Sequence, residues 1–197
     1  MLADASSAGA LLVDLAGDVP AALGLAEPDG PGVEGWLAAG SVVPADALPR
    51  LEVAGPGGLR LLPRGEPDGG GPEPLEGRAT VLAALLDADP RPVVVDCGSA
   101  GDGVGQAIIA AATMSLLVLR PCYLSLRRAQ LLAVRPSGIV LVAAAGRVLR
   151  APDVEAVLDV PVVASVDHDP QVARVVDAGL LGHRVPRPLR RSLRHVA

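Results

Sequence analysis

The chain has 197 residues, half of them apolar, which is enough for one domain with a sizeable hydrophobic core. Its formal net charge of −5 argues against a basic surface that binds nucleic acid through phosphate contacts. Two cysteines are too few for a disulfide framework. No segment approaches the roughly eighteen apolar residues of a membrane-spanning helix, and the first residues do not resemble a signal peptide, so we expect a cytoplasmic protein.

Six short apolar segments are predicted to be β-strands. They are apolar on both faces, which is typical of parallel strands that helices cover on each side. The predicted strands are residues 10–14, 59–63, 93–97, 115–119, 138–143 and 161–166.

Segments of helical length and composition follow most of these strands. The predicted helices are residues 75–88, 104–112, 124–132, 152–158 and 170–178. Repeated alternation of strand and helix predicts a three-layer, doubly wound α/β fold with a mostly parallel sheet. A Pro/Gly-rich loop at 64–74 is interpreted as a solvated connection. Because no repeat or second domain is evident, residues 1–197 are predicted to form a single α/β domain.

Charged residues end several of the predicted strands, where open α/β sheets bind their ligands. At Asp96 a carboxylate can coordinate Mg²⁺, and Gly98 lets the backbone approach a phosphate. Asp14 ends the first strand in the same way. The alternative is that both aspartates cap the turns that follow them. Asp18 is a candidate cap for a helix that starts at Val19.

Three other ligand sites are weighed against simpler interpretations. The glycines between residues 98 and 105 lack the G-x-G-x-x-G spacing of a dinucleotide-binding loop. A phospho-receiver domain would carry a lysine beside its aspartates, and this sequence contains no lysine. The run Asp167-His168-Asp169 offers metal-ligand residue types, but three sequence neighbours rarely converge on one ion. We therefore interpret that run as a loop before a helix that starts at Pro170.

The C-terminal segment has the pattern of a short amphipathic helix. Its apolar face carries Leu189, Leu193 and Val196, and its basic face carries Arg190, Arg191 and Arg194. Such a basic tail can make weak peripheral contact with an anionic membrane or with a partner. The alternative is a last helix that packs on the domain.

Taken in order, the segments resemble the MinD/ParA-like (SIMIBI-class) P-loop ATPases, which include division-site, chromosome-partition and pilus-localisation proteins. The resemblance covers essentially the whole chain. Residues 11–15 are similar to the family's second strand, with 23–25 and the helix at 35–37 after it. The later matches are residues 58–63 to the third strand, 93–98 to the Walker B strand, 117–125 to the next strand and loop, and 169–173 with 177–179 to the loop and helix near the adenine.

The resemblance implies ATP and Mg²⁺ as cofactors of a full-length form. It implies that Asp14, Asp96 and Gly98 lie at the nucleotide and magnesium site, with Asp96 contacting the metal directly or through water. It further implies that Asp167, Asp169 and Pro170 form the adenine-side loop. A homodimer or a complex with a partner protein is the assembly that the resemblance implies.

The sequence departs from the family where activity is concerned. The family's phosphate loop and its lysines precede the second strand, and here no lysine is present. The family's water-positioning acid is replaced by Ala16, and its base-reading asparagine by the run Val142-Ala143-Ala144. We therefore assign no catalytic residue, and we expect no ATP binding or hydrolysis by this chain alone.

Two explanations remain open at this stage. In one, Met1 is an internal methionine of a longer, bacterial MinD/ParA-like protein whose first strand and P-loop lie upstream. In the other, the chain is a pseudo-ATPase scaffold that dimerises or recruits partners without turnover. In the family, the first strand would lie between the strands that end at Asp96 and Leu119. Without it, these two strands either pair directly, about 4.8 Å apart, or leave an empty slot where the first strand would lie. Unpaired central edges would destabilise the chain.

Overall fold

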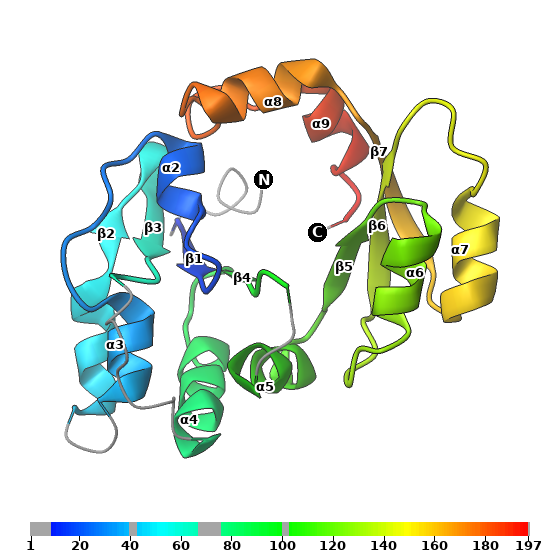
Figure 1. Cartoon of the computed structure of the whole chain (residues 1–197). Helices are drawn as coiled ribbons and strands as arrows, with labels where there is room; N and C mark the ends of the chain where they lie inside the picture. The colour runs from blue at the N-terminus through cyan, green and yellow to red at the C-terminus, as the bar shows by residue number, and fades with distance from the viewer. Residues whose placement is uncertain (1–8, 40–42, 67–75, 100–102, 197) are drawn as a thin grey trace.

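The computed structural model describes residues 9–39, 43–66, 76–99 and 103–196 (Figure 1). Within these residues the strands form two sheets, ordered β2-β3-β1-β4 and β5-β6-β7. Every strand pair is parallel except the antiparallel pair β2–β3. The strands are β1 (Ala10–Asp14), β2 (Val53–Ala54), β3 (Leu59–Leu62), β4 (Val93–Asp96), β5 (Leu116–Leu119), β6 (Gly138–Ala143) and β7 (Val162–Asp167).

Helices connect the strands in the predicted alternation. They are α2 (Val19–Leu23), α3 (Gly32–Ala38), α4 (Glu76–Asp87), α5 (Gly103–Ala111), α6 (Tyr123–Ala129), α7 (Ala151–Leu158), α8 (Pro170–Asp177) and α9 (Arg187–Ser192), with short 3₁₀ segments η2 (Ala45–Leu51) and η3 (Pro56–Gly58). The predicted α/β class with a mostly parallel sheet is confirmed. Of the predicted loop 64–74, residues 67–74 lie outside the described ranges.

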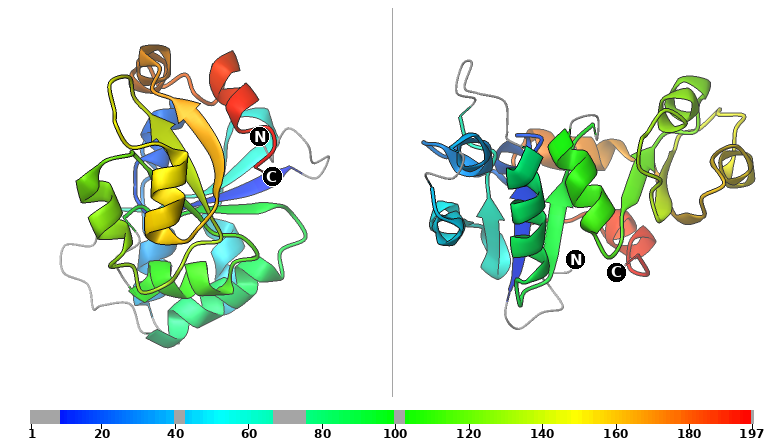
Figure 2. Two further views of the ribbon diagram at one scale, coloured as in Figure 1. Left: turned by 90° about the vertical axis from the view of Figure 1, so that its right-hand side faces the viewer. Right: turned by 90° about the horizontal axis from the view of Figure 1, so that it is seen from below.

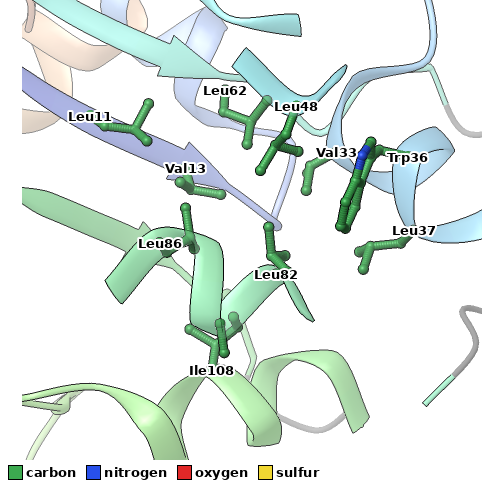
Figure 3. Packing of buried hydrophobic residues seen from close by; sticks show 11 residues of the cluster. Leu11, Val13, Val33, Trp36, Leu37, Leu48, Leu62, Leu82, Leu86 and Ile108 are labelled. Atoms are coloured by element: carbon green, nitrogen blue, oxygen red, sulfur yellow. The ribbon is translucent and has the colours of Figure 1, made fainter. Parts of the chain in front are cut away.

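The first sheet has its own hydrophobic core, shown in Figure 3. The central strand β1 contributes Leu11 and Val13, which pack with Leu82 of α4 and Ile108 of α5. Trp36 supplies the only aromatic ring of this cluster, and the Arg78 guanidinium lies 3.6 Å from its ring centroid. The core is otherwise aliphatic, as a sequence without phenylalanine requires.

The second sheet has a separate core on the side of α6 and α7. Its buried members are Leu119, Leu126, Ile139, Leu141, Val154 and Val160. Seen from below in Figure 2, the β1-containing half and the half with α6 and α7 lie at opposite sides of the molecule. The fold therefore consists of two half-sheets, each with its own core.

The strands β4 and β5 are the neighbouring edges of these two half-sheets, and they do not pair with each other. Direct closure of the sheet, one of the two predicted outcomes, is therefore not what the described residues form. The side chain of Val94 in β4 is 40% exposed, and that of Val118 in β5 is 63% exposed. Apolar residues in the middle of these two strands are therefore exposed to solvent.

A close backbone contact at the end of α8 joins the two halves. Helix α8 follows β7 of the second sheet and packs against α2 of the first half (Figure 1). Gly24 and Gly179 both have positive φ, +72° and +63°, and a Cβ added at Gly24 would overlap the carbonyl group of Gly179. Only glycine permits this approach. We call this contact the α2–α8 clasp; it joins the first half to the end of α8.

Candidate functional site at the carboxyl edge of the sheets

The carboxylates Asp14 and Asp96 lie side by side at the carboxyl ends of β1 and β4. They are register partners in the parallel β1–β4 ladder, and the Leu15 amide donates to the Asp96 carbonyl at 2.9 Å. This is the edge of an open α/β sheet where ligands bind. The structure therefore brings together the two aspartates that the sequence singled out.

The Asp14 carboxylate is fully buried and serves the loop that follows β1. Its Oδ1 accepts from the amides of Ala16 (2.9 Å) and Gly17 (2.7 Å), and its Oδ2 accepts from Val19 (3.1 Å). Three backbone donors account for much of its acceptor capacity. Asp14 therefore orders the loop at residues 15–19.

This arrangement corrects the predicted helix cap. Asp18 occupies the N-cap position of α2, but its side chain makes no capping hydrogen bond. The Val19 amide is satisfied instead by Asp14, which reaches over the intervening turn. Asp18 is exposed to solvent.

Asp96 differs from Asp14 because its side chain is exposed. Its Oδ1 accepts from the Gly98 amide at 2.9 Å, which closes a short turn after β4. Gly98 has φ +57°, and a Cβ there would lie 3.2 Å from the Ala16 Cβ, so the two loops are in contact. Asp96 is thus the carboxylate at this edge that a ligand can reach.

Arg64 joins the same edge from β3, and it was not predicted as a site residue. Its Nε donates to Glu34 Oε2 at 2.6 Å, and its Nη1 donates to the Ala16 carbonyl at 3.3 Å. This bond connects the end of β3 to the Asp14 loop. A charged residue directly after the predicted strand 59–63 was the signal in the sequence that could have identified it.

The predicted adenine-side residues lie at the carboxyl end of the second sheet. Asp167, Asp169 and Pro170 line a cavity of about 370 Å³, together with Pro188 and Leu189 at α9. Asp169 caps α8, since its Oδ1 accepts from the Gln171 amide at 2.8 Å. The two groups of candidate residues therefore belong to different half-sheets.

The basic tail residues Arg190, Arg191 and Arg194 are exposed, and Leu189 and Leu193 are half-buried. Helix α9 ends at Ser192, so Arg194 lies in the turn that follows rather than in a continuous helix. Helix α9 packs against β7. Membrane contact through this tail stays a prediction.

The chain resembles solved structures in its fold. No protein-family model and no curated protein matches the chain. Among solved structures, a ParA family ATPase from Chlorobium tepidum superposes with a TM-score of 0.75 at 18% identity, over 98% of this chain and 85% of that one.

The fold is that of the MinD and ParA ATPases. MinD from Pyrococcus horikoshii, complexed with Mg-ADP, has a TM-score of 0.64 at 18% identity, over 87% of this chain and 73% of that one. The MinC:MinD complex from Aquifex aeolicus matches with a TM-score of 0.65 at 18% identity, over 90% of this chain and 76% of that one. At these identities the likeness shows the MinD/ParA fold.

A MinD/ParA fold raises the question whether these residues fit Mg²⁺ and ATP. Asp96 fits as one carboxylate ligand for magnesium. In the described ranges, no three His, Cys, Asp or Glu side chains gather into a metal site. The phosphate side lacks a lysine altogether, and Arg64 is bound to Glu34 and the Ala16 carbonyl. The residues described therefore do not form a complete site for Mg-ATP.

Over the same ranges, no helix is long and apolar enough to cross a bilayer.

Proposed function

We propose that this chain is the larger part of a cytoplasmic MinD/ParA-type nucleotide-binding protein of the kind that positions division sites, chromosomes or pili. The observation that carries the proposal is the pairing of Asp14 and Asp96 at the carboxyl edge of β1 and β4. An ordered loop behind the buried Asp14 and an exposed Asp96 beside Gly98 are what a magnesium-nucleotide site requires on one of its sides.

The proposal gives each candidate residue a distinct part. Asp96 and Gly98 would face the metal and phosphates, and Asp14 would hold the loop at residues 16–19 in position. Asp167, Asp169 and Pro170 would border the base, in the cavity that they line. The phosphate-binding loop and its lysine would come from a segment upstream of residue 1.

Hydrolysis by residues 1–197 alone is not part of the proposal. Developing charge on a transferred phosphoryl group needs preorganised cations and amides, and the chain has no lysine to supply them. Ala16 has no group that can orient an attacking water molecule.

The direct test is titration of residues 1–197 with ATP and Mg²⁺ by calorimetry, together with the same titration of the product of the full reading frame. We expect no binding by residues 1–197 at millimolar ATP and binding by the longer product. Micromolar affinity of residues 1–197 would show that the phosphate side is complete without an added segment. A stop codon close before Met1, or a longer product that also fails to bind, would contradict the nucleotide-binding role.

A second candidate function is a pseudo-ATPase scaffold, and one observation favours it. Tyr123 and Leu124 on α6 are 73% and 61% exposed, beside the exposed Arg127 and Arg128. Large exposed apolar side chains grouped with arginine are typical of protein interfaces. The scaffold predicts dimers or partner complexes that do not depend on ATP, which light scattering with and without nucleotide would detect.

A further inference from the structure

A second cavity lies at the amino edge of the second sheet, at the opposite end of its strands from Asp167. Its volume is about 360 Å³, and it lies where the C-terminal ends of α6 and α7 meet the starts of the strands. Leu117 lines it from the start of β5, and Val160 lines it two residues before β7 begins. Helices α6 and α7 contact each other on this side of the molecule (Figure 1). The cavity is therefore separate from the candidate nucleotide site.

The walls of this cavity are aliphatic and only partly buried. Val160 is buried, Leu132 and Leu158 are half-buried, and Val157 is 45% exposed. The apolar lining includes Ala129, Leu132, Val134, Val157, Leu158 and Val160. Removing such surface from water favours the binding of an apolar group. Ligand pockets measure roughly 300–1,000 Å³, so this cavity, at the lower end of that range, suits one short chain.

The rim of the cavity carries a cation whose partner is held weakly. Nη2 of Arg135 donates to the Leu158 carbonyl at 3.4 Å and to the Asp159 carbonyl, and it lies 2.5 Å from Asp159 Oδ2. The two side chains are 58% and 92% exposed, and an ion pair so open to water contributes little stability. Within the described residues the bonds of Arg135 all use Nη2, so Nε and Nη1 are available to a ligand.

We propose that this cavity binds a medium-chain fatty acid as its carboxylate, with the alkyl chain against the aliphatic walls and the head group on Arg135. A carboxylate accepts two parallel N–H bonds from a guanidinium, which an alcohol or an ester does not do. Among the described residues that line the cavity, Arg135 is the one cation and Asp159 the one anion. Asp159 therefore competes with the ligand for Arg135. The inference goes beyond the proposed function, and its test uses no nucleotide, so either can fail without the other.

The test is an NMR titration of residues 1–197 with octanoate, at concentrations below those at which octanoate forms micelles. We expect one molecule to bind per chain and to shift the methyl signals of Ala129, Leu132 and Val157. Affinity should rise about fourfold for each methylene group between hexanoate and octanoate, because each is buried against the walls. The control ligand is 1-octanol, which has the same alkyl chain without the charge.

Two rim variants test the head group. Arg135→Gln should weaken octanoate at least fivefold and leave the affinity for 1-octanol within twofold, because only the carboxylate uses the guanidinium. Asp159→Asn removes the competing carboxylate and should strengthen octanoate about two- to fivefold. Asparagine tolerates the left-handed conformation of Asp159, whose φ is 51°, so this variant should keep the end of α7 intact.

A matched pair of variants tests the alkyl chain. Ala129→Leu fills part of the cavity and should weaken octanoate and 1-octanol at least fivefold. Ala156→Leu is the same change at an exposed position of α7 outside the lining, and both affinities should stay within twofold of the parent chain. If Ala129→Leu does not fold, Val157→Asp places a charge in the same wall and should also weaken both ligands.

Four results would overturn the proposal. The first is no saturable binding of millimolar octanoate to the folded chain. The second is several molecules bound per chain, with shifts outside the cavity. The third is an equal loss of octanoate and 1-octanol in Arg135→Gln. The last is binding to phosphatidylglycerol vesicles without binding of octanoate, which would assign this face to a lipid surface.

Discussion

Asp14 and Asp96 occupy paired positions on β1 and β4, yet only the Asp96 side chain is exposed. The difference arises from the loops: the loop after β1 folds three amides onto Asp14, whereas the turn after β4 places one amide on Asp96. The two aspartates end their strands in the same way but have different roles. Asp14 holds the loop after β1 in place, and Asp96 is exposed at the surface.

Replacing Asp14 should destabilise the chain strongly. Asp14→Ala leaves the half-buried amides of Ala16, Gly17 and Val19 without their acceptor, and we expect the free energy of unfolding to fall by about 2–4 kcal/mol. Asp18→Ala is the matched control, because Asp18 is exposed and caps nothing; its effect should stay within about 0.5 kcal/mol. Urea unfolding followed by circular dichroism measures both. Equal effects of the two variants would contradict the role given to Asp14.

The α2–α8 clasp should tolerate no side chain. Gly179→Ala places a methyl group against the backbone of Gly24, and we expect a loss of about 2–4 kcal/mol. Gly57→Ala controls for backbone strain, since Gly57 has nearly the same φ, +66°, with no atom within 4 Å of an added Cβ. Thermal unfolding of both variants separates overlap from strain. If Gly57→Ala costs as much as Gly179→Ala, the close approach is not what stabilises the contact.

An ion-pair network at the amino end of the first sheet should make stability depend on acid pH. Hydrogen bonds from the Arg91 guanidinium lower the pKa of Glu52 and the pKa of Asp89. A carboxyl group with a lowered pKa in the folded state stabilises that state above its ordinary pKa, and this contribution is lost as pH falls through the lowered value.

We therefore expect the melting temperature to fall more steeply below about pH 4.5 in the parent chain than in Arg91→Gln. Arg127→Gln, on the exposed face of α6, should leave the acid dependence unchanged. The measurement is the melting temperature at a series of pH values between about 3 and 7. Parallel curves for Arg91→Gln and the parent would show that the network does not carry the effect.

Local sequence patterns predicted the strands and most helices because apolar runs and helical segments alternate along the chain. The strand β2 was missed, since Val53–Ala54 is too short to form a recognisable run. The burial of Asp14 and the bond from Arg64 to the Ala16 carbonyl depend on how loops turn, which residue types alone do not determine.

The separation into two half-sheets also lay beyond local patterns. The sequence left both closure and a slot open for the edges at Asp96 and Leu119. The contact between Gly24 and Gly179 joins residues far apart in the chain, and a glycine in a sequence does not indicate which backbone approaches it.

Amide hydrogen exchange along β4 and β5, measured by NMR, tests most directly whether these two strands stay unpaired with each other. The account predicts slow exchange at Val94 and Asp96 in β4 and at Leu117 and Leu119 in β5, whose amides face β1 and β6. It predicts exchange about a hundredfold faster at Val95 and Val118, which face the slot. Protection of Val95 and Val118 equal to that of their neighbours would mean that β4 and β5 pair in solution, and would contradict the account.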